Sequence, residues 1–366
     1  MIKYIDKINS FDDFITIVNP LTNKEKGDLF EELTKYIFKY HSNYCQFTKE
    51  VWLLNETPLD LLKQLNLPIK DQGIDLILQD KYNRYHAIQC KYRSNTDEVI
   101  SWADLGTFYG LAFGIAKGFS GGFYVTNTTE ITPNAAKSSK VIPLYGEFFN
   151  DLTNFFTILK TALLSNIPVN STVLNPRPYQ SNIIDETIMH FLDDNRGIIE
   201  SACGTGKTLT TYWIDQEMNN SLTVVAVPSL FLLSQFYSDW AKQMQSEKLK
   251  TDFILVGSDA DCGDVKFENN GLIITTSIKE IANNIKWITK AKNYKIIIIT
   301  TYQSSDKLIS ALNLMKLEPD LCVFDEAHKT VGQTGTQFSL LLDDAKIKIK
   351  KRLFVTATPK VYNGNI

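Results

Sequence analysis

The sequence is poor in cysteine, and its cysteines are not spaced like a metal site or a disulfide framework. Five cysteines occur among 366 residues, an odd number, and no two form a CxxC pair. This spacing argues against a zinc ribbon and against a small disulfide-stapled domain. We therefore expect a chain kept in a reducing compartment, with its cysteines at Cys45, Cys90, Cys203, Cys262 and Cys322.

The sequence also lacks a large net charge and long apolar runs. The 38 Lys and Arg residues nearly balance the 41 Asp and Glu residues, which leaves a net charge of −3. Any contact with nucleic-acid phosphate must then come from a local patch. Apolar runs are short, as at residues 296–299, and the first 14 residues mix charged and apolar side chains. We expect no bilayer span and no signal peptide, and hence a cytoplasmic protein without a membrane partner.

Two blocks of strand-like runs make up most of the chain. Its length and its 44% hydrophobic residues allow two or three domains with cores of their own. Segment 165–178 holds three prolines among small polar residues and is the best candidate for a linker. We expect domains at 1–160 and 177–366, joined by a linker at 161–176. In the second block short strands alternate with helical stretches, which predicts a parallel sheet with crossover helices.

The second block contains a phosphate-binding loop. Residues 201–208 read SACGTGKT, and they follow an apolar strand and precede a helical stretch, as a P-loop requires. Backbone N–H groups of such a loop surround a phosphate, Lys207 would reach the β- and γ-phosphates, and the Thr208 hydroxyl would hold Mg²⁺. Ser201 stands where the common pattern has a glycine. The expected nucleotide-binding residues of the loop are Gly204, Thr205, Gly206, Lys207 and Thr208.

Two further pieces fit a nucleotide site. Asp325 and Glu326 follow an apolar strand directly; Asp325 would bind Mg²⁺, and Glu326 would orient or deprotonate the attacking water. Taken alone, the same residues could be a solvated acidic helix start. Upstream of the loop, the Gln180 amide offers one donor and one acceptor to an adenine edge, although a simple helix-start residue is an equally good interpretation.

These motifs together, with the TAT residues 356–358, resemble superfamily 2 helicases and translocases over residues 177 to about 360. The resemblance implies a first RecA-like domain that binds ATP with Mg²⁺, with His328 at the nucleotide and with Thr356 and Thr358 coupling the ATP state to domain motion. A second RecA-like domain is expected outside this sequence, so ATP turnover by the chain alone should be slow. The resemblance also places Ser229, Thr301 and Ser304 at the nucleic-acid backbone, while ordinary strand-end and helix-cap positions explain them equally well.

A basic run lies just before the TAT residues. It is either a phosphate-binding patch or a solvated strand edge protected against aggregation, and we favour the strand edge. Its members are Lys346, Lys348, Lys350, Lys351 and Arg352.

The first block carries a hairpin with unusual polar residues. The runs 73–79 and 85–93 flank a five-residue polar loop, and pairing of Gln79 with Tyr85 places Asp75 opposite Gln89. Lys91 shares the face of Gln89, because side chains alternate along a strand. Charged groups inside apolar runs are costly unless they have partners. Metal-assisted hydrolysis of a phosphodiester gives them a purpose, since Mg²⁺ prefers oxygen ligands and a lysine can position water or stabilise charge.

At this point the first block resembles the Mrr-like branch of the PD-(D/E)XK nucleases over about residues 22–150. The matching pieces are residues 27–31, 73–75 and 89–91, and Gln89 stands where the wider superfamily has an acidic residue. The resemblance implies a mixed sheet flanked by helices and a metal held by Glu31, Asp75 and Gln89, with Lys91 as a further catalytic residue. A helical wheel places Glu31 opposite an apolar stripe, which leaves Glu32 as an alternative. An inactive fold with an internal Asp–Lys salt bridge also remains open.

An Mrr-like nuclease joined to a superfamily 2 motor resembles the motor subunits of Type I restriction enzymes and, more closely, the Type ISP enzymes. The expected fold class is therefore α/β, with a restriction-endonuclease-like domain followed by a P-loop RecA-like domain. The resemblance implies an ATP-dependent nuclease-translocase acting on double-stranded DNA, with methyltransferase and target-recognition parts outside this sequence. Two alternatives are a viral or mobile-element helicase-nuclease and a DNA-binding ATPase with an inactive nuclease fold.

Overall fold

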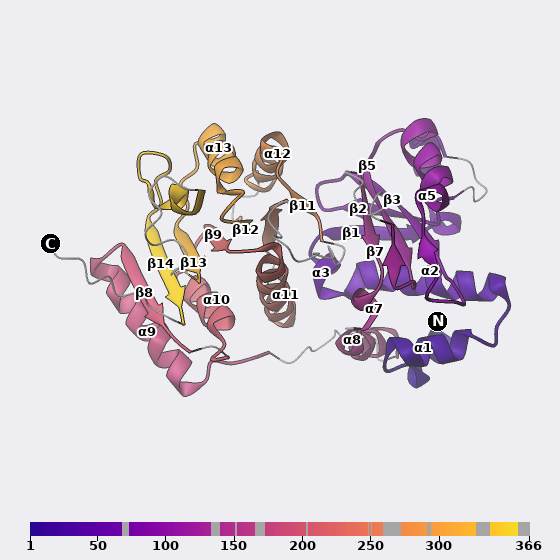
Figure 1. The fold of residues 1–366 in the computed structure, drawn as a ribbon, viewed down its shortest axis with the longest axis horizontal. Coiled ribbons are helices and arrows are strands. Elements are labelled where there is room, and N and C mark those ends of the chain that lie inside the picture. Colours follow the sequence, from indigo (N-terminus) through magenta and orange to yellow (C-terminus); the bar gives the residue numbers. More distant parts are fainter. Residues whose placement is uncertain are drawn as a thin grey trace. The chain divides into compact units, whose positions relative to one another are not determined.

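The computed structural model divides the chain into two compact units, coloured indigo to magenta and pink to yellow in Figure 1. Unit 1 is residues 1–171 with 268–272, and unit 2 is residues 172–267 with 273–366. Placement is described for residues 1–67, 73–132, 140–150, 152–164, 173–202, 204–247, 249, 251–258, 272–290, 294–326 and 337–357. Within these ranges no helix has both the length and the apolar character that a bilayer crossing needs. The domain ends predicted at residues 160 and 177 stay predictions, because 165–172 lie outside the described ranges.

Unit 1 is built on a mixed five-stranded sheet in the order β1-β2-β3-β5-β7. The first three strands pair antiparallel, and β3, β5 and β7 pair parallel. A separate short pair joins β4 to β6. The strands are β1 (Thr48–Leu53), β2 (Leu76–Asp80), β3 (Tyr85–Lys91), β4 (Val99–Ile100), β5 (Phe119–Thr126), β6 (Glu130–Ile131) and β7 (Val141–Leu144).

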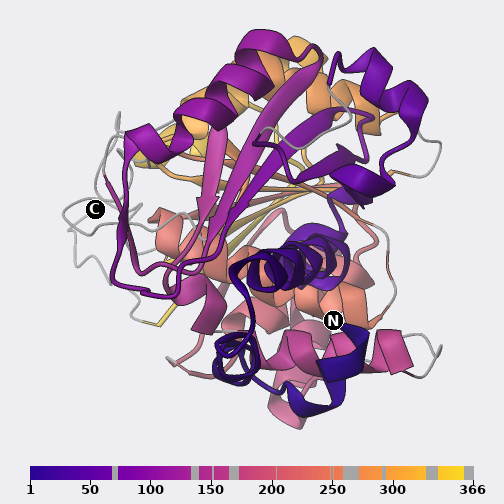
Figure 2. The ribbon, with the colours of Figure 1, turned by 90° about the vertical axis from the view of Figure 1, so that its right-hand side faces the viewer.

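Helices cover both faces of this sheet (Figures 1 and 2). Phe123 of β5 packs against Phe38 on one face, with ring centroids 4.7 Å apart. Its neighbour Tyr124 points the other way, into a core cluster with Leu105 and Phe108, as the alternation of side chains along a strand requires. The helices are α1 (Phe11–Val18), α2 (Asn23–Tyr40), α3 (Ser42–Cys45), α4 (Leu59–Gln64), α5 (Trp102–Tyr109), α7 (Glu147–Asn150) and α8 (Thr153–Leu164).

The hairpin of β2 and β3 has the predicted register. Gln79 pairs with Tyr85, and the ladder runs back to the pair of Leu76 with Ile88. Buried Asp80 fixes the turn: its carboxylate accepts hydrogen bonds from the backbone N–H groups of Tyr82 and Arg84 and lies 2.9 Å from His86 Nε2. A turn held in this way leaves little freedom for a register slip, which would move every side chain to the other face.

Unit 2 is a seven-stranded parallel sheet in the order β11-β10-β12-β9-β13-β14-β8, as predicted for the second block. Every residue of β9, β12 and β13 is buried, and strands of a parallel sheet that are covered on both faces have continuous apolar sequences. The strands are β8 (Arg196–Glu200), β9 (Leu222–Val227), β10 (Asp252–Val256), β11 (Ile274–Thr275), β12 (Ile296–Thr301), β13 (Leu321–Asp325) and β14 (Lys351–Thr356). The helices are α9 (Pro178–Asp193), α10 (Lys207–Glu217), α11 (Leu230–Ser246), α12 (Ile278–Ile288) and α13 (Ser305–Met315).

Candidate functional site

The P-loop of unit 2 connects β8 to α10 with two glycines in the left-handed region. Gly204 has φ +80° and Gly206 has φ +76°. Gly206 is also the N-cap of α10, and Lys207 is the first helical residue. Only glycine adopts this backbone at little cost, so the residues on which the sequence motif depends are those that the turn requires.

The loop carries its own internal hydrogen bonds. Lys207 Nζ donates to the backbone oxygens of Ser201 and Ala202 at 3.2 and 3.3 Å. The Thr205 hydroxyl donates to the Ala202 oxygen at 2.8 Å. Buried Trp240 donates from Nε1 to the Thr208 oxygen at 2.9 Å, which ties the first turn of α10 to α11. The lysine ammonium is thus already at the mouth of the loop, bound to weak neutral acceptors that a phosphate can replace.

Gln180 is pressed against the same loop. It is buried, its Oε1 accepts from the Arg177 N–H at 2.9 Å, and its Nε2 donates to the Thr205 oxygen at 3.1 Å and the Thr210 hydroxyl at 3.2 Å. Both ends of the amide have partners within the protein, so its pairing with adenine stays a prediction. The structure also shows that Gln180 packs closely on the loop, because a Cβ placed on Gly206 would lie only 2.8 Å from Gln180 Nε2.

The acidic motif ends a strand at the same edge of the sheet as the P-loop. β14 lies between β13 and β8, with Asp325 paired to Val355 and Thr356 to Glu200. The Ser201 N–H donates to the Thr356 oxygen at 3.1 Å. Neighbouring strands are about 4.8 Å apart, so Asp325 is about 10 Å from the end of β8, across the sheet edge. The sheet therefore brings the predicted metal ligand and the phosphate loop together.

Two details mark the end of β13. Asp325 is buried, and its backbone oxygen accepts a hydrogen bond from Tyr302 Oη at 2.7 Å. Glu326 has φ +50°, a conformation that costs a non-glycine residue free energy and is concentrated at functional sites. His328 and Thr358, predicted at the nucleotide and in the TAT motif, lie outside the described residues.

The three hydroxyl residues predicted at nucleic acid lie at the end of β12 and at two helix N-caps. Ser229 is the N-cap of α11 and accepts from the Leu232 N–H at 3.4 Å. Thr301 accepts from the N–H of Ser304, which is the N-cap of α13. These bonds fit the helix-cap interpretation, and a contact with nucleic acid stays a prediction.

The strand edge expected at the basic run is wrong, whereas Lys346, Lys348 and Lys350 are exposed to solvent as expected. β14 is an internal strand, because β8 pairs with its outer side. Arg352 is only 2% exposed, and its guanidinium donates to Asp344 at 2.6 Å and to the Leu341 oxygen at 3.1 Å. Lys350 pairs with Asp320 at 2.6 Å, and Lys351 Nζ donates to the Phe191 oxygen at 2.7 Å. The cause of the error is that β8, which covers β14, lies 155 residues earlier in the sequence.

In unit 1 the predicted nuclease residues meet where β2 begins and β3 ends. The Asp75 N–H donates to the Ile88 oxygen at 2.9 Å, and its carboxylate accepts from the Cys90 N–H at 2.6 Å. These bonds extend the ladder beyond Leu76, which places Asp75 opposite Gln89, as predicted. Gln89 is 3% exposed, and its Oε1 has no hydrogen-bond partner among the described residues.

An unpartnered buried oxygen is costly unless a ligand satisfies it. Among the described residues no three His, Cys, Asp or Glu side chains form a metal-binding group. The candidate set is instead two carboxylates, Asp75 and Glu31, with the amide oxygen of Gln89. Hard oxygen donors of this kind suit Mg²⁺, which keeps several waters. The residues present therefore fit the ion that the sequence predicts.

The two glutamates of α2 have different surroundings. Glu32 is bound by the Met1 ammonium at 2.5 Å and by Tyr36 Oη at 3.4 Å, so this alternative ligand is already engaged. Glu31 is half-buried. Burial raises the pKa of the Cys90 thiol, and the charges of Asp75 and Glu31 raise it further. Both carboxylates thus act on Cys90, which is one residue before the end of β3.

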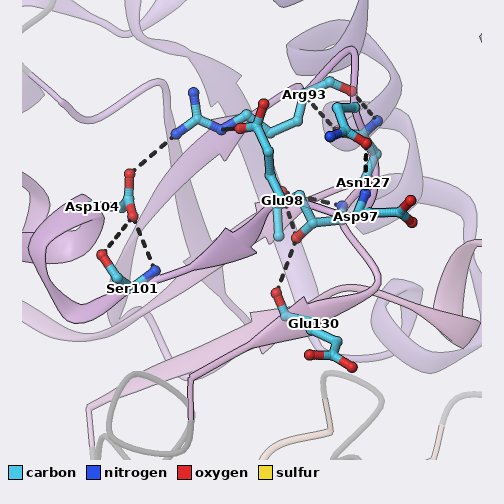
Figure 3. A network of polar contacts seen from close by, with 10 residues as sticks. Arg93, Asp97, Glu98, Ser101, Asp104, Asn127 and Glu130 are labelled. Carbon is cyan, nitrogen blue, oxygen red and sulfur yellow. Dashed lines mark hydrogen bonds and ion pairs between the residues drawn. The ribbon is translucent and has the colours of Figure 1, made fainter.

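Sequence reasoning missed a polar network at the exit of β3 (Figure 3). Arg93 Nη2 donates to Asp104 at 3.1 Å, and Arg93 Nε is 3.3 Å from a Glu98 carboxylate oxygen. Asn127 Oδ1 accepts from the Arg93 N–H at 2.6 Å, and Asn127 Nδ2 donates to the Arg93 oxygen at 2.8 Å. Hydrogen bonds from Ser101 and the charges of Arg93 and Lys91 lower the pKa of Asp104. The sequence did contain one signal for this network: side chains alternate along a strand, so Arg93 lies on the same face as Lys91.

Together the two sites define a restriction-type nuclease unit followed by a superfamily 2 helicase-type unit. Residues 173–361 match the family described as Type III restriction enzyme, res subunit, and residues 39–154 match one described as restriction endonuclease. The first match spans more than half of the chain, which therefore belongs to the family of type III restriction enzyme res subunits. The expected combination of an Mrr-like nuclease and a superfamily 2 unit, as in Type ISP enzymes, is confirmed.

Several known proteins are similar. The solved structure of the ATP-dependent Type ISP restriction-modification enzyme LlaBIII bound to DNA is 26% identical, covers 97% of this chain and 23% of its own, and has a TM-score of 0.77. A probable helicase of African swine fever virus is 29% identical over 190 residues, which are 52% of this chain and 20% of the viral protein. The chain thus spans about a fifth of the length of these relatives.

Proposed function

We propose that this chain is an ATP-dependent, restriction-type DNA nuclease-translocase, in which unit 1 cuts double-stranded DNA and unit 2 drives movement along it. The observation that carries the nuclease half is the unpartnered, 3% exposed Gln89 Oε1 at the position opposite Asp75. The relative LlaBIII, which is described as bound to DNA, is consistent with double-stranded DNA as the partner.

In the proposed nuclease reaction, Asp75, Glu31 and the Gln89 amide oxygen would hold Mg²⁺. The bound ion would lower the pKa of a coordinated water and polarise the scissile phosphate. Lys91 positions the attacking water and stabilises the charge that develops on the phosphate. The Cys90 N–H, which donates to Asp75 at 2.6 Å, holds that carboxylate in place beside Gln89.

In the proposed ATPase reaction, the P-loop N–H groups and Lys207 bind the phosphates, and Lys207 exchanges its bonds to the Ser201 and Ala202 oxygens for phosphate oxygens. Thr208 and Asp325 would hold Mg²⁺, and Glu326 would orient the attacking water. The Thr356 backbone oxygen accepts a hydrogen bond from the Ser201 N–H, so a movement of the loop would act directly on Thr356. The proposed enzyme also needs parts outside this sequence, namely a second RecA-like domain and methyltransferase and target-recognition parts.

Nicking of supercoiled plasmid by the 366-residue chain with Mg²⁺ tests the nuclease half. Asp75→Asn keeps an oxygen for the Cys90 N–H but removes the charge, and we expect it to slow nicking about 100-fold or more. Lys91→Met should do the same, while the exposed Lys39→Met serves as a matched control with unchanged nicking. Absence of nicking with every divalent ion would refute the nuclease half and favour an inactive DNA-binding fold.

A viral or mobile-element helicase-nuclease is the second candidate, because the viral relative matches 190 residues at 29% identity. Both candidates share the two reactions, so the sequence of the complete protein distinguishes them. A methyltransferase motif after the motor would support the restriction function. Its absence from the complete protein would favour DNA processing.

A further inference from the structure

Lys26 on α2 is a buried cation with little to neutralise it. The residue is 9% exposed, and Nζ donates to Ser94 Oγ at 3.2 Å. Within the described ranges this neutral hydroxyl is its sole hydrogen-bond or ion-pair partner. A lysine ammonium has three donors and a full charge, and burial without a counterion is costly. Folding alone gives no reason to keep a lysine here.

The position of Lys26 within its helix increases this cost. α2 begins at Asn23, so Lys26 lies in its first turn. Backbone N–H groups at a helix N-terminus carry partial positive charge, which disfavours cations and favours anions. The Glu25 carboxylate of this turn accepts from the Thr22 N–H and hydroxyl, so a bound anion would supply the counterion that Lys26 lacks.

The site is next to the proposed nuclease strand. Phe30, one turn after Lys26, packs edge-on against Tyr92 with ring centroids 5.7 Å apart. α2 therefore runs along the chain that leaves β3, with Phe30 at Tyr92 and Lys26 at Ser94. Ser94 is exposed and three residues beyond Lys91, which limits their Cα separation to about 11 Å. DNA rises about 3.4 Å per nucleotide along its axis, so the two positions are at most about three nucleotides apart along a bound strand.

We propose that Lys26 and Ser94 form a subsite for a backbone phosphate of DNA, one to three nucleotides from the phosphate that is cut. The subsite rests on the proposed nuclease function and extends it, because it fixes the path of the strand past Lys91. The Ser94 hydroxyl donates to the phosphate, and Lys26 beneath it supplies the charge. Such a contact sets register and orientation without reading sequence.

The test uses the full 366-residue chain, a fluorescent 30-base-pair duplex and Ca²⁺ without ATP. Lys26→Met preserves the buried stem and removes the charge. We expect about 5- to 10-fold weaker binding at 0.1 M salt and a salt slope smaller by about 1. Hydrogen exchange of residues 92–98 should be slowed by duplex in the wild type and unaffected by it in the variant. Lys39→Met on the exposed end of the same helix should match the wild type in both measurements.

Stability separates this function from a structural role. Lys26→Met should raise the unfolding midpoint or leave it unchanged, because among the described residues the lysine has only the neutral Ser94 hydroxyl as a partner. Ser94→Asp supplies an internal anion, so it should stabilise the protein and weaken duplex binding more than Ser94→Ala does. Unchanged affinity and salt slope, or an affinity loss that follows a lowered midpoint, would overturn the subsite. If instead Asp75→Asn leaves nicking unchanged, the proposed nuclease centre fails while the Lys26 result can still stand.

Discussion

Replacement of Gly206 by alanine tests how the P-loop is held. Its φ of +76° costs an alanine about 1–2 kcal/mol. The new Cβ would also lie 2.8 Å from Gln180 Nε2, too close for both groups to stay. Gln180 is buried and must give up its bonds to the Thr205 oxygen or the Thr210 hydroxyl. Each lost bond adds about 1 kcal/mol, so Gly206→Ala should cost about 2–4 kcal/mol.

Gly204→Ala is the matched control, because its φ of +80° is similar and a Cβ there would have no neighbour within 4 Å. It should cost only the backbone strain, about 1–2 kcal/mol. Urea unfolding monitored by fluorescence should show the two midpoints separated by about 0.5–1 M, at about 2 kcal/mol per molar urea. Replacing Gln180 by alanine as well should remove most of the difference between the two glycine variants. Equal midpoints for both would refute the idea that Gln180 braces the loop.

Two further predictions concern buried charge. Burial would raise the pKa of Asp80, but the His86 hydrogen bond and the Arg84 charge outweigh it and lower the pKa below the usual 3.8. The ionised Asp80 should therefore stabilise unit 1 above about pH 4, and this stabilisation should be lost as the pH falls further. Acid unfolding of Asp80→Asn should show a weaker pH dependence in that range. Arg352→Met should lower the free energy of unfolding of unit 2 by about 3 kcal/mol, because the Leu341 oxygen loses its donor. Urea unfolding followed by circular dichroism would measure this loss. An unchanged midpoint would mean that the buried guanidinium makes no net contribution to stability.

The sequence predicted most reliably what depends on local pattern. The register of the hairpin followed from side-chain alternation and loop length, and the pair of Gln79 with Tyr85 confirms it. Continuous apolar strands such as residues 296–301 indicated a covered parallel sheet, and all six residues are buried. The P-loop was recognisable because its glycines are required by the turn itself.

What the sequence did not reveal depends on neighbours distant along the chain. Nothing near Arg352 indicates that β8, formed by residues 196–200, covers its strand. Asn127 lies 34 residues from Arg93, yet its side-chain amide hydrogen-bonds to both the N–H and the carbonyl oxygen of that residue. The sequence does not single out Lys26, and only the packing of α2 shows that it is buried. Long-range pairings of this kind leave no periodic trace in the sequence.

One hydrogen bond joins parts of unit 2 that are 155 residues apart: the Ser201 N–H donates to the Thr356 oxygen at 3.1 Å. If the P-loop rearranges when phosphate enters or leaves, β14 must travel with it or this bond must break. The exchange of the Ser201 amide proton with solvent should therefore report how often the loop separates from the end of β14.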